Sequence, residues 1–232
     1  MKKIFFLALT LFIVYNSNSQ TNIVQNVPFT NIGPTIMSGR IVSAAINPNN
    51  TTEFYAAYAS GGLWYTKNNG TTFTCITNNA PTQNMGAIAV DWKNKIIWIG
   101  TGESNSSRSS YAGIGVLKSI DNGKTWQNVG LKNSQHIGKI IINKNKPNEV
   151  IVGVIGHLYT PNKERGIYKT MDGGKTWQNV LFIDENTGVI DISQSPTNPN
   201  ILYAASWERE RKAWNFKGSG ENSGIYKSTD AG

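Results

Sequence analysis

The sequence has a single cysteine, few charged residues and no long apolar run. One cysteine among 232 residues cannot form an internal disulfide or supply a cysteine-rich zinc site. Only 16% of the residues are charged and 39% are hydrophobic, which excludes a charge-rich disordered chain. The apolar run at residues 4–15 is shorter than the roughly 17–25 residues that a spanning helix needs. The fold must therefore rest on packing, and no membrane span is expected.

The first residues have the pattern of an export signal. Lys2 and Lys3 precede the apolar run, and a polar stretch with small Ser17 and Ser19 follows it. This order predicts a secretory signal peptide over residues 1–19, cleaved after Ser19. We therefore expect a secreted, periplasmic or cell-surface protein. We expect residues 20–38 to form a separate N-terminal segment, in which residues 22–32 would be a strand that completes a final sheet of the fold.

An eight-residue pattern recurs along the chain, at residues 66–73, 119–126 and 170–177. A further copy starts at residue 228 and reaches only its fifth position. Asp or Asn stands third, Gly fifth, and an aromatic residue closes each full copy. These positions are Asn68, Gly70, Phe73, Asp121, Gly123, Trp126, Asp172, Gly174, Trp177, Asp230 and Gly232.

The segments around these copies repeat as well. In the third period, for example, β-rich runs at residues 138–142, 150–155 and 166–169 precede the pattern, with turns rich in Asn, Pro and Lys between them. No segment has helical periodicity. Four short strands in about fifty residues are typical of an all-β fold, the β-propeller with four-stranded blades, and fit a sandwich or a β-helix poorly. We expect blades near residues 39–80, 86–130, 138–183 and 188–232, the last of them truncated.

The recurring pattern is the Asp-box, also called the bacterial neuraminidase repeat. It would join the third strand of a blade (C) to the fourth (D), because Asp or Asn and Gly suit a turn that needs side-chain hydrogen bonds and positive φ. The closing ring is expected to fold back onto its own blade and cover apolar surface. The box thus has a structural role, and Asp121 and Asp172 are not nominated as catalytic acids.

Several stretches carry a closer resemblance, namely residues 31–34, 38–40, 59–64, 102–111, 156–159 and 207–211. They resemble the sortilin-like N-terminal propeller of bacterial secreted proteins that are often labelled glycosyl hydrolase. The resemblance implies a ligand-binding propeller of which this sequence is an N-terminal fragment. The remaining blades of a full-length chain would then be its partners.

Two enzyme groups also have Asp-box propellers, and each match is incomplete. Xyloglucanase-type enzymes place a catalytic Asp just before a Gly-Gly pair, whereas Ala59 and Ser60 precede Gly61-Gly62 here. Sialidases have an Arg-Ile-Pro segment, whereas Arg40 is followed by Ile and Val. A glycoside hydrolase therefore stays an alternative to a peptide- or glycan-binding module, and a scaffold propeller without a small-molecule site is a second alternative.

The longest connections predict where a ligand would bind. Residues 100–113, 155–166 and 206–223 all join the second strand (B) to strand C, and in a propeller these loops share a face with the D–A connections. Long loops on a rigid scaffold commonly carry function. Their rings and arginines suit a sugar or peptide. The candidate ligand-binding residues are Arg40, Glu103, Arg108, Tyr111, His157, Tyr159, Arg165, Trp207, Arg209, Arg211 and Trp214.

Hydrolysis of a glycoside would need two carboxyl groups, roughly 5–5.5 Å apart for retention or 6.5–9.5 Å for inversion. The candidates are Glu103, Glu164, Asp184 and Glu208. The alternative is that the loop acids pair with neighbouring arginines such as Arg165, Arg209 and Arg211, and only order the loops. We assign no cofactor and no metal ligand. The net charge of +8 is distributed by repeated lysines, so nucleic-acid binding is not expected.

Overall fold

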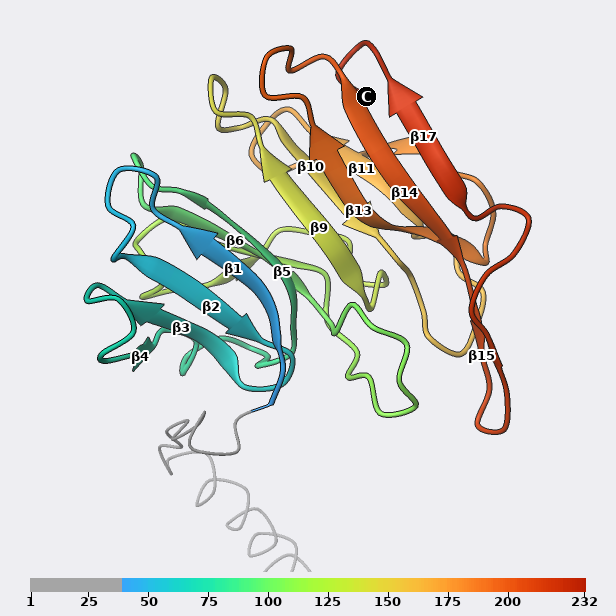
Figure 1. Ribbon diagram of the computed structural model, residues 1–232, viewed down its shortest axis with the longest axis horizontal. Coiled ribbons are helices and arrows are strands. Elements are labelled where there is room, and N and C mark those ends of the chain that lie inside the picture. The colour runs from blue at the N-terminus through green and yellow to red at the C-terminus, as the bar shows by residue number, and fades with distance from the viewer. Residues whose placement is uncertain (1–38) are drawn as a thin grey trace, which may run out of the picture. The chain divides into compact units, whose positions relative to one another are not determined.

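The structure is a computed structural model that describes residues 39–232 (Figure 1). The signal peptide and the possible closing strand predicted from the sequence lie outside the described residues. Within residues 39–232 every regular element is a β-strand. None of the described segments forms a helix long and apolar enough to cross a membrane. The all-β prediction is confirmed.

The strands form four sheets in series and one extra hairpin, which lies between the second and third strands of the fourth sheet. Their bounds are β1 (Ile41–Ile46), β2 (Phe54–Tyr58), β3 (Gly62–Thr66) and β4 (Thr74–Cys75); β5 (Met85–Asp91), β6 (Ile96–Thr101), β7 (Val116–Ser119) and β8 (Gln127–Asn128); β9 (Ile137–Ile142), β10 (Val150–Val154), β11 (Gly166–Thr170) and β12 (Gln178–Leu181); β13 (Thr187–Gln194), β14 (Leu202–Glu208) and β17 (Gly224–Ser228); and the hairpin β15 (Glu210–Arg211) with β16 (Phe216–Lys217).

Neighbouring strands in each sheet are antiparallel. In the third sheet, for example, Val152 of β10 lies opposite Ile140 of β9 on one side and Tyr168 of β11 on the other. The first three sheets have four strands, and the fourth has three described strands. This is the arrangement that the sequence period predicts: an all-β propeller with about four blades, the last incomplete.

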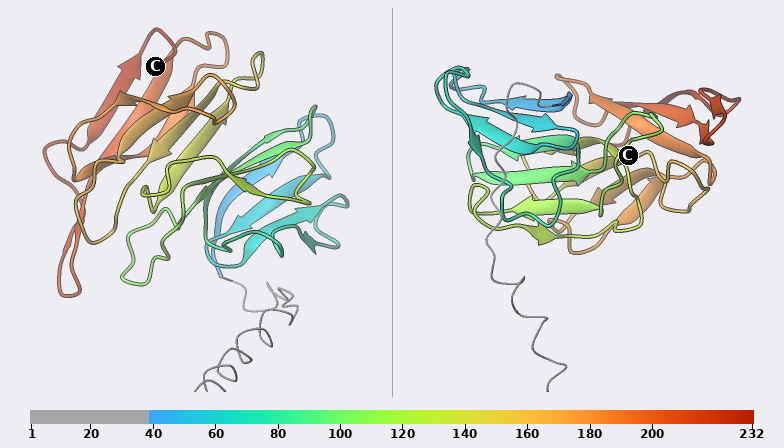
Figure 2. Two further views of the ribbon diagram at one scale, coloured as in Figure 1. Left: turned by 180° about the vertical axis from the view of Figure 1, so that it is seen from behind. Right: turned by 90° about the horizontal axis from the view of Figure 1, so that it is seen from below.

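The first strands of successive sheets, β1, β5, β9 and β13, lie next to one another, so the sheets pack face to face (Figure 2). The cores lie between the sheets. Leu63 of the first sheet packs with Met85 and Leu117 of the second, and Trp98 of the second packs with Val152 of the third. Each sheet thus depends on its neighbours to bury its apolar faces.

The Asp-box joins strand C to strand D in each complete sheet, as predicted. In the second sheet the hydroxyl of Ser119 donates to Asp121 Oδ1 and accepts from Gly123 N, and the same carboxylate accepts from Thr125 N at 2.9 Å. Asn122 and Gly123 have φ of 63° and 86°, which is why a residue tolerant of positive φ and a glycine stand there.

The closing tryptophans behave differently from the prediction that they fold onto their own blade. The indole Nε1 of Trp126 donates to Ile76 O of the first sheet at 3.1 Å, and that of Trp177 donates to Val129 O of the second at 2.7 Å. The physical reason is that the residue after each short strand D has a backbone carbonyl at the outer edge of the sheet, where an indole N–H can satisfy it. The ring of Phe73 has no N–H, and it does pack on its own sheet, against Phe54.

The repeated lysines of strand C also link sheets. Lys118 Nζ donates to Gly173 O of the next Asp-box at 2.9 Å, and Lys169 Nζ donates to Ala231 O at 2.7 Å. Lys118 lies over the ring of Trp98 as well, 4.6 Å from its centroid. These charges therefore stabilise contacts between sheets, in agreement with their regular spacing in the sequence.

Candidate functional site

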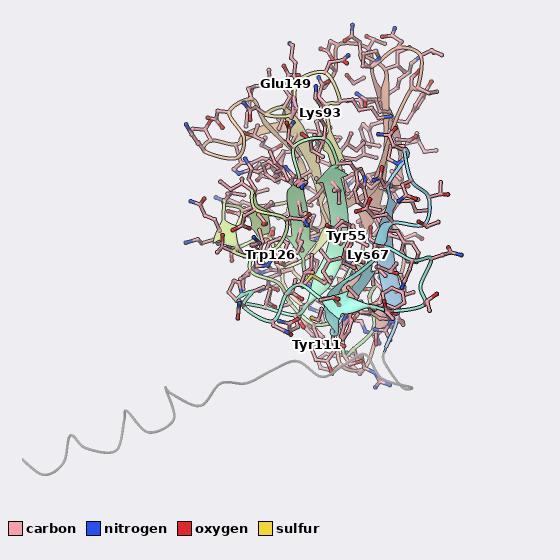
Figure 3. All side chains as sticks on the ribbon, turned by 90° about the vertical axis from the view of Figure 1, so that its left-hand side faces the viewer. Tyr55, Lys67, Lys93, Tyr111, Trp126 and Glu149 are labelled. Carbon is pink, nitrogen blue, oxygen red and sulfur yellow. The ribbon has the colours of Figure 1, made fainter. Side chains whose placement is uncertain are left out.

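The connections of the sheets fall on two opposite faces. Tyr111, on a B–C loop, lies at one end of the molecule in Figure 3, and Lys93 and Glu149, on A–B turns, lie at the other end. We use the name B–C loops for residues 102–115, 155–165 and 209–223. The loops at 102–115 and 209–223 project from the same end of the sheets in both Figure 1 and Figure 2.

The three B–C loops, which lie far apart in the sequence, are hydrogen-bonded to one another. Tyr159 Oη donates to Arg108 O at 2.6 Å, and Arg108 Nη1 donates to Ala213 O at 3.3 Å. Arg209 Nη1 closes the set by donating to Asn105 O at 2.9 Å. The loops of the second, third and fourth sheets therefore form one connected surface.

Part of the third B–C loop is regular, because it forms the hairpin β15–β16. Glu210 pairs with Lys217 and Arg211 with Phe216 in its ladder, and the guanidinium of Arg211 lies 5.0 Å from the centre of the Phe216 ring. Strand β14 also extends through Trp207 and Glu208, which the sequence placed in the loop. Regular pairing thus holds this insertion in place.

Arg165 is the most enclosed charged side chain of the loop face, with 1% of its surface exposed. Its Nη1 donates to Ile155 O at 2.6 Å and Asn186 O at 3.3 Å, and its Nη2 donates to His157 O at 2.8 Å and Thr160 O at 3.2 Å. Its Nε is buried without a partner among the described residues. Arg165 therefore ties a B–C loop to the D–A connection beside it.

Arg209 is buried in a similar way, with 2% of its surface exposed. Besides Asn105 O, it donates to Gly156 O through Nη2 at 3.4 Å, and its guanidinium lies 4.9 Å from the centre of the Trp207 ring. Its Nε also lacks a partner within residues 39–232. In both buried arginines the terminal nitrogens thus donate to backbone carbonyls, and the Nε–H has no acceptor among the described residues.

Neither buried arginine forms an ion pair with a carboxylate of the described chain, so the expectation that loop acids pair with Arg165, Arg209 and Arg211 is wrong. Burial lowers the pKa of Arg165 to about 10, with Asp184 acting weakly in the opposite direction. Burial and the charge of Arg165 lower the pKa of Arg209 to about 9. Carbonyl dipoles, rather than carboxylates, solvate the two charges.

Arg165, Arg209 and Arg211 line a cavity of about 240 Å³ between the third and fourth sheets, which we call the B–C cavity. Two ion pairs contribute to its lining, since Glu208 pairs with Lys217 at 2.6 Å and Glu210 with Lys212 at 3.0 Å. Tyr159 contributes an aromatic ring. The complete lining is Leu158, Tyr159, Thr160, Pro161, Arg165, Asn186, Glu208, Arg209, Glu210, Arg211, Lys212 and Lys217.

Glu103 lies at the start of the first B–C loop and is fully buried, and it forms an ion pair with Arg40, whose side chain is 58% exposed. Oε2 of Glu103 has no partner among the described residues. The backbone carbonyl of Glu103 contacts Nδ1 of buried His136 at 2.8 Å. Burial and the charges of Arg209, His157 and Arg165 lower the pKa of His136 to about 3, so His136 is neutral with its proton on Nδ1.

His157, a predicted ligand-binding residue, has both ring nitrogens engaged. Nδ1 lies 2.8 Å from Thr160 Oγ1, and Nε2 lies 2.9 Å from Asn133 O. Its pKa is lowered, mainly by burial. Within residues 39–232 no group of three His, Cys, Asp or Glu side chains could hold a metal ion. His157 therefore acts as a hydrogen-bonding residue of the loop.

Two of the acidic candidates, Asp184 and Glu208, accept hydrogen bonds from backbone N–H groups of the loops. Asp184 accepts from Asn186 N at 2.6 Å and Thr187 N at 2.7 Å, and these bonds outweigh burial, so its pKa is lowered. Glu208 accepts from Lys217 Nζ and from Asn222 N at 3.0 Å, and the lysine is the main cause of its lowered pKa. Both side chains remain ionised, so neither is poised as a general acid.

Glu164 is the acidic candidate whose pKa is raised, because burial disfavours its charge, and its Oε2 lacks a partner among the described residues. It does not line the B–C cavity, and neither do Glu103 or Asp184. The acids that do line it, Glu208 and Glu210, are paired with lysines. The cavity thus does not bring two of the four predicted catalytic carboxylates together.

Of the aromatic residues predicted to bind a ligand, some line the cavity or contact its arginines and others lie outside it. Tyr159 lines the cavity. Trp207 donates through Nε1 to Gly218 O at 2.8 Å, and its ring lies against the guanidinium of Arg209. Tyr111 and Trp214 lie outside the cavity, with 51% and 85% of their surfaces exposed.

Sequence reasoning missed Asn162, whose Oδ1 accepts from His157 N at 2.9 Å and whose Nδ2 donates to Asn133 O at 3.3 Å. An Asn in a long loop next to Pro161 is the only signal for it.

Comparison with known proteins agrees with this fold. No protein-family model matches the chain. Over 109 residues, 45% of its length, it is 30% identical to vacuolar protein sorting/targeting protein 10 of Kluyveromyces lactis, of which it covers 6%. The chain is a distant homologue of the Vps10/sortilin type, and spans a small part of that relative.

Solved structures with similar folds include two β-propeller proteins, an enzyme and a peptide complex. The GH74 enzyme of Niastella koreensis is 22% identical, with a TM-score of 0.56, and the match covers 81% of this chain and 28% of that one. Ycf48 bound to D1 peptide is 15% identical, with a TM-score of 0.50, and the match covers 79% of this chain and 55% of that one. At these identities the likeness is one of fold.

Proposed function

We propose that this chain is part of an exported, sortilin-like Asp-box propeller that binds a peptide or glycan ligand at its B–C loops. The observation that carries the proposal is the B–C cavity, which three arginines line, on a face where hydrogen bonds join three loops from different sheets. Concave sites with a few convergent polar groups are the usual places for ligands. The distant relation to a Vps10-type protein supports binding as the role.

A peptide is the better candidate of the two. Sites for neutral sugars commonly present aromatic rings for stacking, whereas Tyr159 supplies the aromatic ring of this cavity and charged residues make up most of its lining. The fold is also shared with Ycf48, which is described as bound to a peptide. A binding experiment on a peptide array and a glycan array separates the two ligand classes. If the chain bound to neither array, the remaining interpretation would be a scaffold propeller without a small-molecule site.

A glycoside hydrolase is the second candidate, because GH74 enzymes share the fold. Its test is turnover of chromogenic glycosides and polysaccharides by the purified chain and by two variants, Glu103→Gln and Glu208→Gln. Turnover that either variant abolishes would overturn the binding-only proposal. Absence of turnover together with array binding would support it.

Export is a proposal that rests on the sequence of residues 1–19. Its test is expression of the whole chain with its own N-terminus in a bacterial host, followed by mass spectrometry of the secreted or periplasmic fraction. We expect a protein that starts at Gln20. An intact Met1 on protein that stays in the cytoplasm would contradict the proposal.

A further inference from the structure

Two segments of the B–C loops, residues 104–112 and 209–217, expose aromatic rings, and we call them the loop tips. Trp214 has 85% of its surface exposed, the largest value of any large apolar side chain in the described chain. Tyr111 is 51% exposed and Phe216 is 42% exposed. Both tips belong to loops that project from the same end of the sheets (Figure 1 and Figure 2). Exposed rings gathered on projecting loops indicate contact with another molecule or surface.

The exposure of Trp214 is built into a hydrogen-bonded turn. Lys212 N donates to Asn215 O at 2.8 Å and closes the end of the hairpin β15–β16. Arg108 of the other loop tip donates to Ala213 O, next to Trp214, at 3.3 Å. The two tips are therefore joined, and contact through Trp214 would not have to pay for ordering its backbone.

Positive charge surrounds the exposed rings. Residues 209–217 have four basic side chains and one acidic side chain, Glu210, which pairs with Lys212 at 3.0 Å. Residues 104–112 add Arg108 and no acid. The loop tips thus have an excess of positive charge.

Two of these cations have no acidic partner in the described part of the chain. At the base of the hairpin Glu208 pairs with Lys217 at 2.6 Å, whereas Arg108 and Arg211 form no ion pair within residues 39–232. The guanidinium of Arg211 lies 5.0 Å from the centre of the Phe216 ring. A cation and an exposed ring therefore lie side by side on the hairpin.

A membrane surface matches this combination of rings and charge. Trp and Tyr rings favour the level of the lipid headgroups, and clustered Lys and Arg side chains are attracted to anionic headgroups. Trp214, Phe216 and Tyr111 do not line the B–C cavity, so they are not presented to a ligand bound there. Rings on projecting loops can enter a layer of headgroups, whereas a folded protein partner would need a matching pocket for each ring.

We propose that the loop tips dock on a membrane surface that contains anionic lipid, with Trp214 at the level of the headgroups and Arg108 and Arg211 at the lipid phosphates. Docking of this kind is a peripheral contact, and it goes beyond ligand binding in the B–C cavity. It places the cavity next to the membrane, because Arg211 also lines the cavity.

The test is an environment-sensitive NBD label on the 232-residue chain. Cys75→Ser removes the native thiol, and the label is then attached through Asn215→Cys, beside Trp214, or through Lys124→Cys, in an Asp-box on the opposite face. The vesicles contain phosphatidylcholine alone or a three-to-one mixture of phosphatidylcholine and phosphatidylglycerol. Residues 1–19, whose apolar run can bind lipid by itself, are common to both samples, so the comparison of the two labels reports on the loop tips.

We expect the emission of the label at position 215 to shift to shorter wavelength with the anionic vesicles, and to respond less to phosphatidylcholine alone or at high salt. The label at position 124 should not respond. No shift at position 215, or equal shifts at both positions, would overturn the proposal.

Two exposed apolar residues provide a matched pair of variants in the chain labelled at position 215. Trp214→Ser should reduce the emission shift by at least about half, because the ring that enters the headgroups is lost. Ile120→Ser, at a side chain that is 71% exposed on the opposite face, should leave the shift unchanged. Equal reductions in the two variants would reduce the effect to general apolar exposure and overturn the docking site.

Membrane docking and the proposed function fail separately. A chain that binds array peptides but shows no vesicle response at position 215 would overturn docking and leave peptide binding intact. A chain that docks on vesicles and retains no array peptide would do the reverse. Absence of a vesicle response, together with loss of array binding in Trp214→Ser, would assign Trp214 to a peptide contact and overturn the lipid surface.

Discussion

The indole of Trp177 donates a hydrogen bond to the backbone carbonyl of Val129, 2.7 Å away in the preceding sheet. Trp126 makes the equivalent bond to Ile76 O. The Asp-box thus contributes to packing between sheets as well as to the turn within its own sheet. These two bonds link the sheets whose opposite face carries the B–C loops.

The tryptophan bond predicts a position-dependent loss of stability. Trp177→Phe keeps a large ring but removes the indole N–H, and should lower the free energy of unfolding by about 1 kcal/mol. Trp177→Ala should cost about 3–5 kcal/mol, because it also leaves a cavity next to Trp98. Urea unfolding measures both. Phe73→Ala is the control, since Phe73 is 40% exposed and packs within its own sheet; a loss as large as that of Trp177→Ala would contradict the account.

Lysines at equivalent strand-C positions should differ in importance. Lys118→Met removes the hydrogen bond to Gly173 O and the contact with the Trp98 ring, and should destabilise the protein by about 1–2 kcal/mol. Lys67→Met is the matched variant in the first sheet, where the side chain is exposed, and should be nearly neutral. Thermal unfolding of both chains checks this, and equal shifts in Tm would show that the link between sheets has no energetic effect.

His136 predicts a pH dependence with a definite sign. Its pKa of about 3 in the folded protein is below the unfolded value near 6.5, so the neutral form stabilises the fold. This contribution is complete above pH 6.5 and is lost as the pH falls toward 3, since the unfolded chain then binds a proton that the folded chain does not. His136→Asn can keep the donor to Glu103 O without the titration.

The measurement is the free energy of unfolding between pH 7 and pH 4.5. We expect the native chain to lose stability across this range with a slope of up to about 1.4 kcal/mol per pH unit from this group. His136→Asn should have a visibly smaller slope. An unchanged slope would mean that His136 is charged, or solvated, in the folded protein.

The fold follows from the sequence because its signals are local. Asp121, Gly123 and Trp126 stand within one turn, and the same turn recurs with a constant period, so the hairpin and the four-stranded sheets could be predicted without long-range information. The direction of the Trp126 ring could not. It depends on a carbonyl fifty residues earlier in the chain, in a sheet whose position only the packing decides.

The candidate site was predictable to the level of the loops and not of the contacts. Loop length and residue type identified Arg165, Arg209 and Arg211, but the acids expected to neutralise them bind elsewhere. The partners of Arg165 and Arg209 are backbone carbonyls, which every residue has and no sequence pattern marks. The hairpin β15–β16 was missed because its two strands have two residues each, too few for alternation to be visible.

The most direct measurement of the central claim is hydrogen–deuterium exchange of the chain with and without a peptide selected on the array. Because the ligand is proposed to bind at the B–C loops, protection should be confined to residues 102–115, 155–165 and 209–223. The Asp-box hairpins at residues 119–126 and 170–177, on the opposite face, should exchange at the same rate in both samples. Protection of the hairpins with unchanged B–C loops would contradict the account.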